Sequence, residues 1–186
     1  MQEIIDKTKK FVFDKYSKYN GKFGPQFMKI VTEESIKLAN TLSNGKDLNK
    51  SALLLGIYLH DIGRTITDSQ EHTIEGKKIA EIFLKENGVK DKKILEIVFD
   101  CILNHGSKSH PITDEGKLVK FIDKAVLINP EIIKLYYESL LKEQDKTSAK
   151  QILSAKLEKW YSSLGNKKKE FKDRYEECLD YINSLI

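Results

Sequence analysis

The segment LLLGIYLHDIGR, residues 53–64, joins an apolar run to a histidine, an aspartate and a glycine. The apolar run is typical of a buried helix, and Gly63 can end that helix. His60 and Asp61 therefore stand at the end of a buried element, where a carboxylate without a partner is costly. We expect the pair either to be hydrogen-bonded inside a core or to bind a metal ion. Which of these two roles applies depends on whether other potential metal ligands of the chain lie near His60 and Asp61.

The composition is that of an ordinary globular protein, with 40% apolar and 32% charged residues in a chain of 186. This length suits one core with a helical appendage. The net charge is only +4 and is carried almost entirely by lysines, so we expect no specific nucleic-acid binding. Cys101 and Cys178 are far apart and are interpreted as small apolar residues of a reducing compartment. The charged N-terminus and the lack of a long apolar segment predict a cytoplasmic protein without a membrane span.

Apolar residues recur at helical spacing along the whole chain, and no segment has the alternation of a strand. Start and stop signals predict these helices: 2–19, one from Pro25 to Asn44-Gly45, one capped by Asp47 or Asn49 that carries 53–59, one from His72 to Asn87-Gly88, one from Asp91 to Asn104, one from Thr113 through Val126, one over about 131–163 with a break near 144–145, and one over 167–185. The sequence therefore predicts an all-α fold. We expect a helical core over residues 1–130 and a C-terminal helical extension over 131–186, packed on that core.

Histidine occurs only at positions 60, 72, 105 and 110. Three of these fall at predicted helix ends, where a bundle can gather polar side chains without breaking its core. Asp123 stands inside the apolar helical segment VKFIDKAVLI and needs a partner there. Imidazole and carboxylate groups together suit a divalent ion such as Mn, Fe, Co, Ni or Zn. Such an ion can acidify a bound water and polarise a phosphoryl oxygen.

The order His60-Asp61, His72, His105 and Asp123 resembles the HD-domain superfamily of metal-dependent phosphohydrolases. The similarity covers about residues 22–128. It depends on four segments in the same order: LLLGIYLHDIGR, EHTIEGKKIAEIFLKENG, IVFDCILNHG and VKFIDKAVLI. The resemblance implies an HD-domain-like helical bundle and one or two divalent ions (Mn, Fe, Co, Ni, Zn or Mg). It also implies hydrolysis of a phosphate ester in a nucleotide or a similar small phosphorylated metabolite.

The resemblance assigns roles to the metal ligands. His60, Asp61 and Asp123 match three ligands of the family's simplest metal site. His72 and His105 match two further histidines that hold a second metal or contact phosphate. In this family pattern Asp61 also orients the attacking water.

Three residues are candidates for contact with the substrate. Arg64 directly follows HDIG, where related enzymes often carry a basic residue that faces phosphate, and a guanidinium fork fits that task. His110 and Lys124 are further candidates for substrate binding. Each has a plainer alternative, since Arg64 or Lys124 can be a solvated cation and His110 a surface histidine. Asp68 in the same loop as Arg64 is expected to be solvated.

The family pattern fails at one position. Its first histidine usually lies four residues before a valine and twelve before an alanine on the second helix, and Val31 and Ala39 therefore point to Phe27. A phenylalanine cannot bind a metal, and no histidine precedes His60.

Several consequences of Phe27 stay open. Fewer ligands can hold the ion, His72 and His105 can compensate, Gln26 or Glu34 can reach the site, or the centre is inactive. Two other functions therefore remain: a catalytically impaired protein that binds metal or nucleotide, and a helical interaction scaffold. Whether the chain forms a homo-oligomer is open as well.

Overall fold

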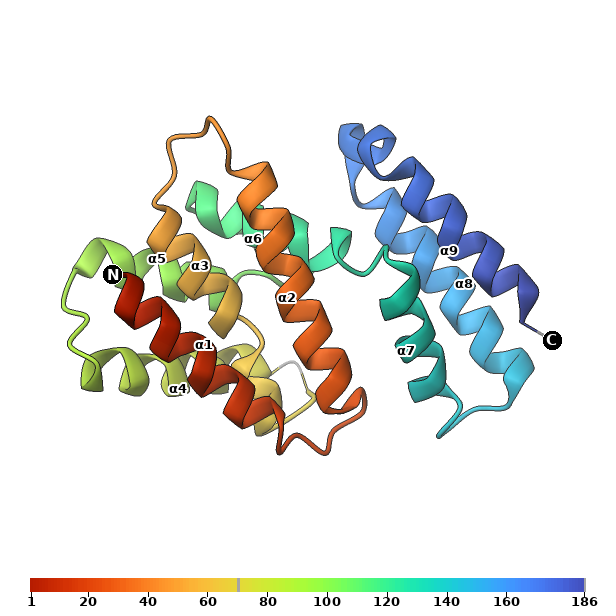
Figure 1. The fold of residues 1–186 in the computed structure, drawn as a ribbon, viewed down its shortest axis with the longest axis horizontal. Helices are drawn as coiled ribbons and strands as arrows, with labels where there is room; N and C mark the ends of the chain where they lie inside the picture. The colour runs from red at the N-terminus through yellow and green to blue at the C-terminus, as the bar shows by residue number, and fades with distance from the viewer. Residues whose placement is uncertain (70, 186) are drawn as a thin grey trace. The chain divides into compact units, whose positions relative to one another are not determined.

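The computed structural model describes residues 1–69 and 71–185, and Figure 1 shows its ribbon. These residues form helices and no strand, which confirms the predicted all-α class. The elements are α1 (Gln2–Tyr16), α2 (Gly24–Leu42), α3 (Lys50–Leu59), the 3-10 helix η1 (Ile62–Thr65), α4 (His72–Glu86), α5 (Lys92–Leu103), α6 (Asp114–Ala125), α7 (Pro130–Leu140), α8 (Lys146–Ser162), the 3-10 helix η2 (Gly165–Phe171) and α9 (Lys172–Ser184). Within the described ranges no helix has both the length and the apolar character that a bilayer span requires.

The chain divides into two compact units, Met1–Ile122 and Asp123–Ile186, with the boundary inside α6. The division that the sequence predicted at residue 130 stays a prediction. In the second unit α7, α8 and α9 pack on one another. Trp160 meets Tyr136 edge to face at 5.4 Å between ring centroids, which accounts for two of the aromatic residues of this unit.

Helix α3 is the centre of the first unit and packs against α1, α2 and α5. Its apolar run is continuous because the helix is covered on several sides, so hardly any position faces water. At Gly56 the helix lies tightly against α5, since a Cβ atom there would be 2.7 Å from Sγ of Cys101. The buried residues of α3 are Ala52, Leu53, Leu55, Gly56, Ile57, Tyr58 and Leu59.

Side chains cap α3, α5 and α6, and of the two candidates for α3, Asp47 and Asn49, the cap is Asn49. The Asn49 side chain accepts a hydrogen bond from the backbone N–H of Ala52 at the start of α3. Asp91 accepts from the first turn of α5, and the Thr113 hydroxyl accepts from the N–H of Gly116 in α6. At its other end α3 stops at Leu59, and the HDIG segment turns into η1. This 3-10 turn was not predicted.

Asp100, a buried carboxylate on α5, fixes the loop that leads into α6. It accepts hydrogen bonds from the backbone N–H groups of Ile112 and Thr113, from the Thr113 hydroxyl and from the Asn104 amide. Burial opposes its ionisation, but these donors outweigh burial and lower the pKa of Asp100 below its ordinary value of 3.8. The ionised form therefore stabilises the folded chain.

We expect Asp100→Asn to lower the free energy of unfolding by about 2 kcal/mol at pH 7, because an amide serves these donors less well than a carboxylate. Since the folded pKa is depressed, the stabilisation is complete above about pH 3.8 and is lost as the pH falls through the folded pKa. Urea unfolding of both proteins between pH 7 and pH 3 measures this. The difference between the two free energies of unfolding should become smaller in acid. A difference that does not change with pH would contradict the role of ionised Asp100.

Candidate metal centre

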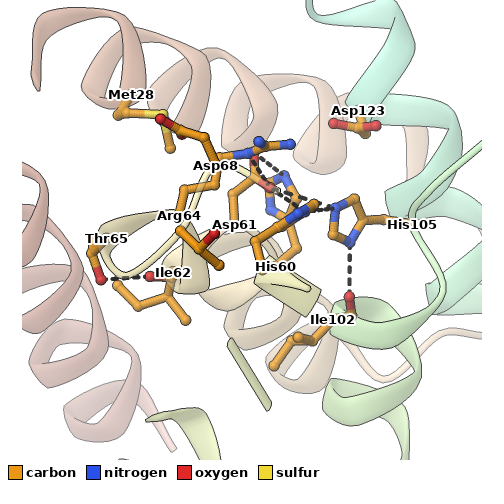
Figure 2. Close-up of polar contacts among 12 residues, drawn as sticks. Met28, His60, Asp61, Ile62, Arg64, Thr65, Asp68, Ile102, His105 and Asp123 are labelled. Carbon is orange, nitrogen blue, oxygen red and sulfur yellow. Dashed lines mark hydrogen bonds and ion pairs between the residues drawn. The ribbon is translucent and has the colours of Figure 1, made fainter. Parts of the chain in front are cut away.

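Three side chains of the first unit converge on one point. Asp61 lies between α3 and η1, His72 opens α4, and His105 follows α5. Nε2 of His72 lies 3.1 Å from Nε2 of His105 and 3.2 Å from Oδ1 of Asp61, and the His105 nitrogen lies 3.4 Å from the same oxygen. Figure 2 shows Asp61 and His105 turned toward each other, with Arg64 beside Asp61. The side chains of all three residues are almost completely buried.

The backbone fixes the tautomer of each histidine near this point. Nδ1 of His60, His72 and His105 lies 2.8 Å from the carbonyl oxygen three residues earlier, of Ile57, Ser69 and Ile102 respectively. A carbonyl can only accept, so Nδ1 carries the proton and Nε2 of the neutral ring carries the lone pair. Metal-binding histidines are commonly oriented by a carbonyl in this way.

The donor set fits a divalent cation. Two lone pairs and a carboxylate oxygen that face one another repel unless a positive charge lies among them. Adjacent ligand atoms at bonds of about 2.0–2.2 Å lie about 2.8–3.1 Å from one another around an octahedral ion and about 3.3–3.6 Å around a tetrahedral one. The three separations in the structure, 3.1, 3.2 and 3.4 Å, fall within the range of about 2.8–3.6 Å that the two geometries span. Asp61, His72 and His105 can therefore hold a metal ion without rearrangement.

Asp61 is ionised in this arrangement. Burial opposes its charge, but the Arg64 guanidinium and the neighbouring histidines outweigh burial and hold the pKa of Asp61 well below its ordinary value. Nε of Arg64 forms an ion pair with Oδ1 of Asp61 at 2.8 Å. Arg64 is thus attached to the cluster through Asp61, and its side chain remains 22% exposed, so one end of the site reaches solvent.

Comparison with known proteins identifies the family of the chain. The family model of the HD domain matches residues 32–126, about half of the chain. The chain belongs to the HD-domain family. A search of curated proteins and a search of solved structures gave no significant match. HD domains are in general metal-dependent phosphohydrolases, and the His/Asp cluster of this HD domain is consistent with that chemistry.

Four other residues were expected at the site, and each has a defined position in the structure. His60, the histidine of HD, is buried, and its Nε2 lies 3.8 Å from Oδ2 of Asp61. Asp123 and Lys124 belong to the second unit, in the last turn of α6, where the Lys124 ammonium donates to the Asp123 carboxylate. His110 is exposed in the loop between α5 and α6. The ligand and substrate roles predicted for these four residues stay predictions.

Phe27 lies on α2 and is buried, with 5% of its surface exposed. Its ring stacks on Phe23 at 4.7 Å between centroids, as an apolar residue of the core does. Gln26 lines a cavity of about 310 Å³ with Phe13 and Tyr16, and Glu34 pairs with Lys37. The alternatives to a histidine at position 27 stay predictions, including the one in which His72 and His105 supply nitrogen ligands.

Sequence reasoning missed the backbone groups that orient the centre. The carbonyls of Ile57, Ser69 and Ile102 all lie three residues before a histidine, so the spacing was available in the sequence. It also gave no role to Asp68, which is exposed but accepts two hydrogen bonds from the turn after α1. No local pattern marks these contacts, because Asp68 lies more than forty residues along the chain from both Tyr19 and Lys22.

Proposed function

We propose that this HD domain is a cytoplasmic metal-dependent phosphohydrolase that acts on a phosphate ester of a nucleotide or similar small metabolite. One observation carries the proposal: Nε2 of His72, Nε2 of His105 and Oδ1 of Asp61 lie within 3.4 Å of one another, with both imidazole lone pairs directed into the cluster. Membership of the HD-domain family supports the general reaction class.

In this proposal Asp61, His72 and His105 hold a divalent ion, and His60 and Asp123 complete the centre. Support for Asp123 comes from the family pattern, in which it matches the last aspartate ligand. Mixed nitrogen and oxygen ligands suit Mn, Fe, Co, Ni or Zn. Mg is also a candidate, although it prefers oxygen ligands. The bound ion supplies Lewis acidity, which makes water more acidic and withdraws charge from a phosphoryl oxygen.

The protein groups around the ion divide the remaining work. Oδ1 of Asp61 faces the two histidines, which leaves Oδ2 to accept a hydrogen bond from the attacking water and to orient it toward phosphorus. The Arg64 guanidinium carries five N–H donors, and its fork matches the oxygens of a phosphate. It stabilises the negative charge that develops on the transferring group. His110 and Lys124 contact the rest of the substrate.

The function is tested by turnover of nucleoside monophosphates and of an aryl phosphate, each with Mn²⁺, Co²⁺, Ni²⁺, Zn²⁺ or Mg²⁺. We expect hydrolysis with at least one ion, and a rate more than about 10³-fold lower for Asp61→Ala, which loses a ligand and the group that orients water. Absence of turnover by a protein that binds the ion would overturn the enzymatic assignment. It would favour the second candidate, a metal- or nucleotide-binding protein without catalysis, which the buried Phe27 in the place of the first histidine also favours.

Arg64→Ala is expected to lower kcat/KM about 10²-fold, because a preorganised donor to the transferring phosphate is lost. The metal content should stay at the wild-type value, since Arg64 is not a ligand. Steady-state kinetics and elemental analysis on the same preparations separate these effects. Arg174→Ala is the matched control, because Arg174 is the other arginine of the chain and lies on α9 in the second unit. An unchanged kcat/KM for Arg64→Ala would remove Arg64 from the mechanism.

A further inference from the structure

The turn after α1 is joined to the segment before α4 through a single carboxylate. The Tyr19 hydroxyl donates to Oδ1 of Asp68 at 2.5 Å, and the backbone N–H of Lys22 donates to Oδ2 at 3.2 Å. The Tyr19 side chain is buried, with 4% of its surface exposed. Both oxygens of Asp68 therefore bind the same turn of the chain.

Gly21 shows that this turn is shaped around the Tyr19 ring. A Cβ atom at Gly21 would lie 2.2 Å from the ring and from the hydroxyl oxygen of Tyr19. The ring thus lies directly against the Gly21 backbone, which fixes the direction in which the hydroxyl points. Burial and the bond to Asp68 raise the pKa of Tyr19 well above its ordinary value, so the hydroxyl keeps its proton and remains a donor at neutral pH.

The residue after Asp68 controls the orientation of His72. The carbonyl oxygen of Ser69 accepts a hydrogen bond from the backbone N–H of His72 at 3.2 Å, and Nδ1 of the His72 ring lies 2.8 Å from the same oxygen. This one carbonyl sets both the start of α4 and the tautomer of the ring. With Nδ1 protonated, Nε2 presents its lone pair to Asp61 and His105.

We propose that Tyr19 and Asp68 are positioning residues for His72. By tying Asp68 to the turn after α1, they hold the Ser69 carbonyl where the His72 ring needs it. His60 and His105 differ in this respect, because the carbonyls that orient them belong to the regular helices α3 and α5. The Ser69 carbonyl lies before α4 begins. Hydrogen bonds to Thr67 and Glu71 hold Ser69 within its own loop, and the bonds of Asp68 join that loop to the turn after α1. The effect of this positioning on metal affinity rests on the proposed function, because it requires that His72 binds a metal ion.

The decisive test is the tautomer of His72 in the metal-free full-length chain, read from the imidazole ¹⁵N chemical shifts. We expect Nδ1–H at all three buried histidines of the wild type. In Tyr19→Phe and in Asp68→Ala we expect a mixture of tautomers at His72, with His60 and His105 unchanged. An unchanged His72 in both variants would overturn the inference. So would an equal change at all three histidines, because that result indicates general loosening of the first unit.

Affinity for Mn²⁺ measures the consequence for the centre. Loss of a group that orients a ligand commonly lowers metal affinity about 10-fold, and we expect this in each variant. The double variant should bind Mn²⁺ no more weakly than Asp68→Ala alone, since Asp68→Ala already removes the bond that Tyr19→Phe removes. Tyr175→Phe is the matched control: its hydroxyl also donates to a carboxylate, Glu158, at 2.6 Å, but in the second unit. A wild type that binds no Mn²⁺ contradicts the proposed function, and the His72 tautomer still decides the positioning role.

Discussion

Replacing His105 by alanine is expected to lower the affinity for Mn²⁺ or Zn²⁺ by more than about 100-fold, because the change removes one of three converging ligands. Asp61→Asn should have an effect of the same order, since it keeps the shape of the side chain and removes its charge. Nε2 of His105 lies within 3.4 Å of both other donor atoms, so the change removes a nitrogen donor from the cluster itself. Calorimetric titration of the chelator-treated protein measures these affinities.

His110→Ala is the control for this experiment. It removes a histidine from the loop that follows His105, but His110 is exposed and outside the three-residue cluster. The metal affinity of this variant should equal that of the wild type within about 2-fold, because His110 is not one of the converging ligands. Equal losses for His105→Ala and His110→Ala would contradict a centre at the buried histidines. Circular dichroism of each variant checks that the helices are retained.

Gly63→Ala is expected to destabilise the first unit by about 3 kcal/mol or more and to abolish metal binding, because the added methyl group has no space. A Cβ atom there would lie 1.9 Å from the carbonyl oxygen of His72 and 2.5 Å from the backbone nitrogen of Gly76. Both neighbours are backbone atoms of α4, so only displacement of the helix that carries His72 can relieve the contact. Urea unfolding and Mn²⁺ titration measure the two effects.

Gly106→Ala provides the comparison for Gly63→Ala. A Cβ at Gly106 would meet only Oγ of Ser109, at 3.7 Å, which is an ordinary contact. We expect its unfolding free energy to change by less than about 1 kcal/mol. If Gly63→Ala were equally mild, the close approach of η1 to α4 would not be what positions His72. A glycine is thus required at position 63 because the backbone of η1 packs directly against α4, and not only because a helix ends there.

The sequence was most informative where the signals are local. Caps were predicted from residue type and position at Asp47 or Asn49, at Asp91 and at Thr113. Asn49, Asp91 and Thr113 each accept a hydrogen bond from the first turn of the helix that follows. The apolar run before His60 predicted a buried helix, and α3 is buried along almost its whole length. Such features are set by neighbours in the chain, which is why a single sequence contains them.

Features that depend on distant contacts were not predictable in the same way. The 3-10 turn after Asp61 follows from the approach of Gly63 to α4, and the bond between Tyr19 and Asp68 joins segments that no spacing rule relates. The order of His72 and His105 suggested that they share a site, but their separation of 3.1 Å depends on the packing of α4 on α5. Phe27 could be located by its offset from Val31 and Ala39, whereas its stacking on Phe23 required the fold.

The most direct test of the centre is an anomalous difference map from crystals of the full-length chain grown with Mn²⁺. A peak bonded at about 2.0–2.3 Å to Oδ1 of Asp61 and to Nε2 of both His72 and His105 is the predicted result. A map with no peak among these three atoms at saturating Mn²⁺, or with the ion bound only at other residues, would contradict the account.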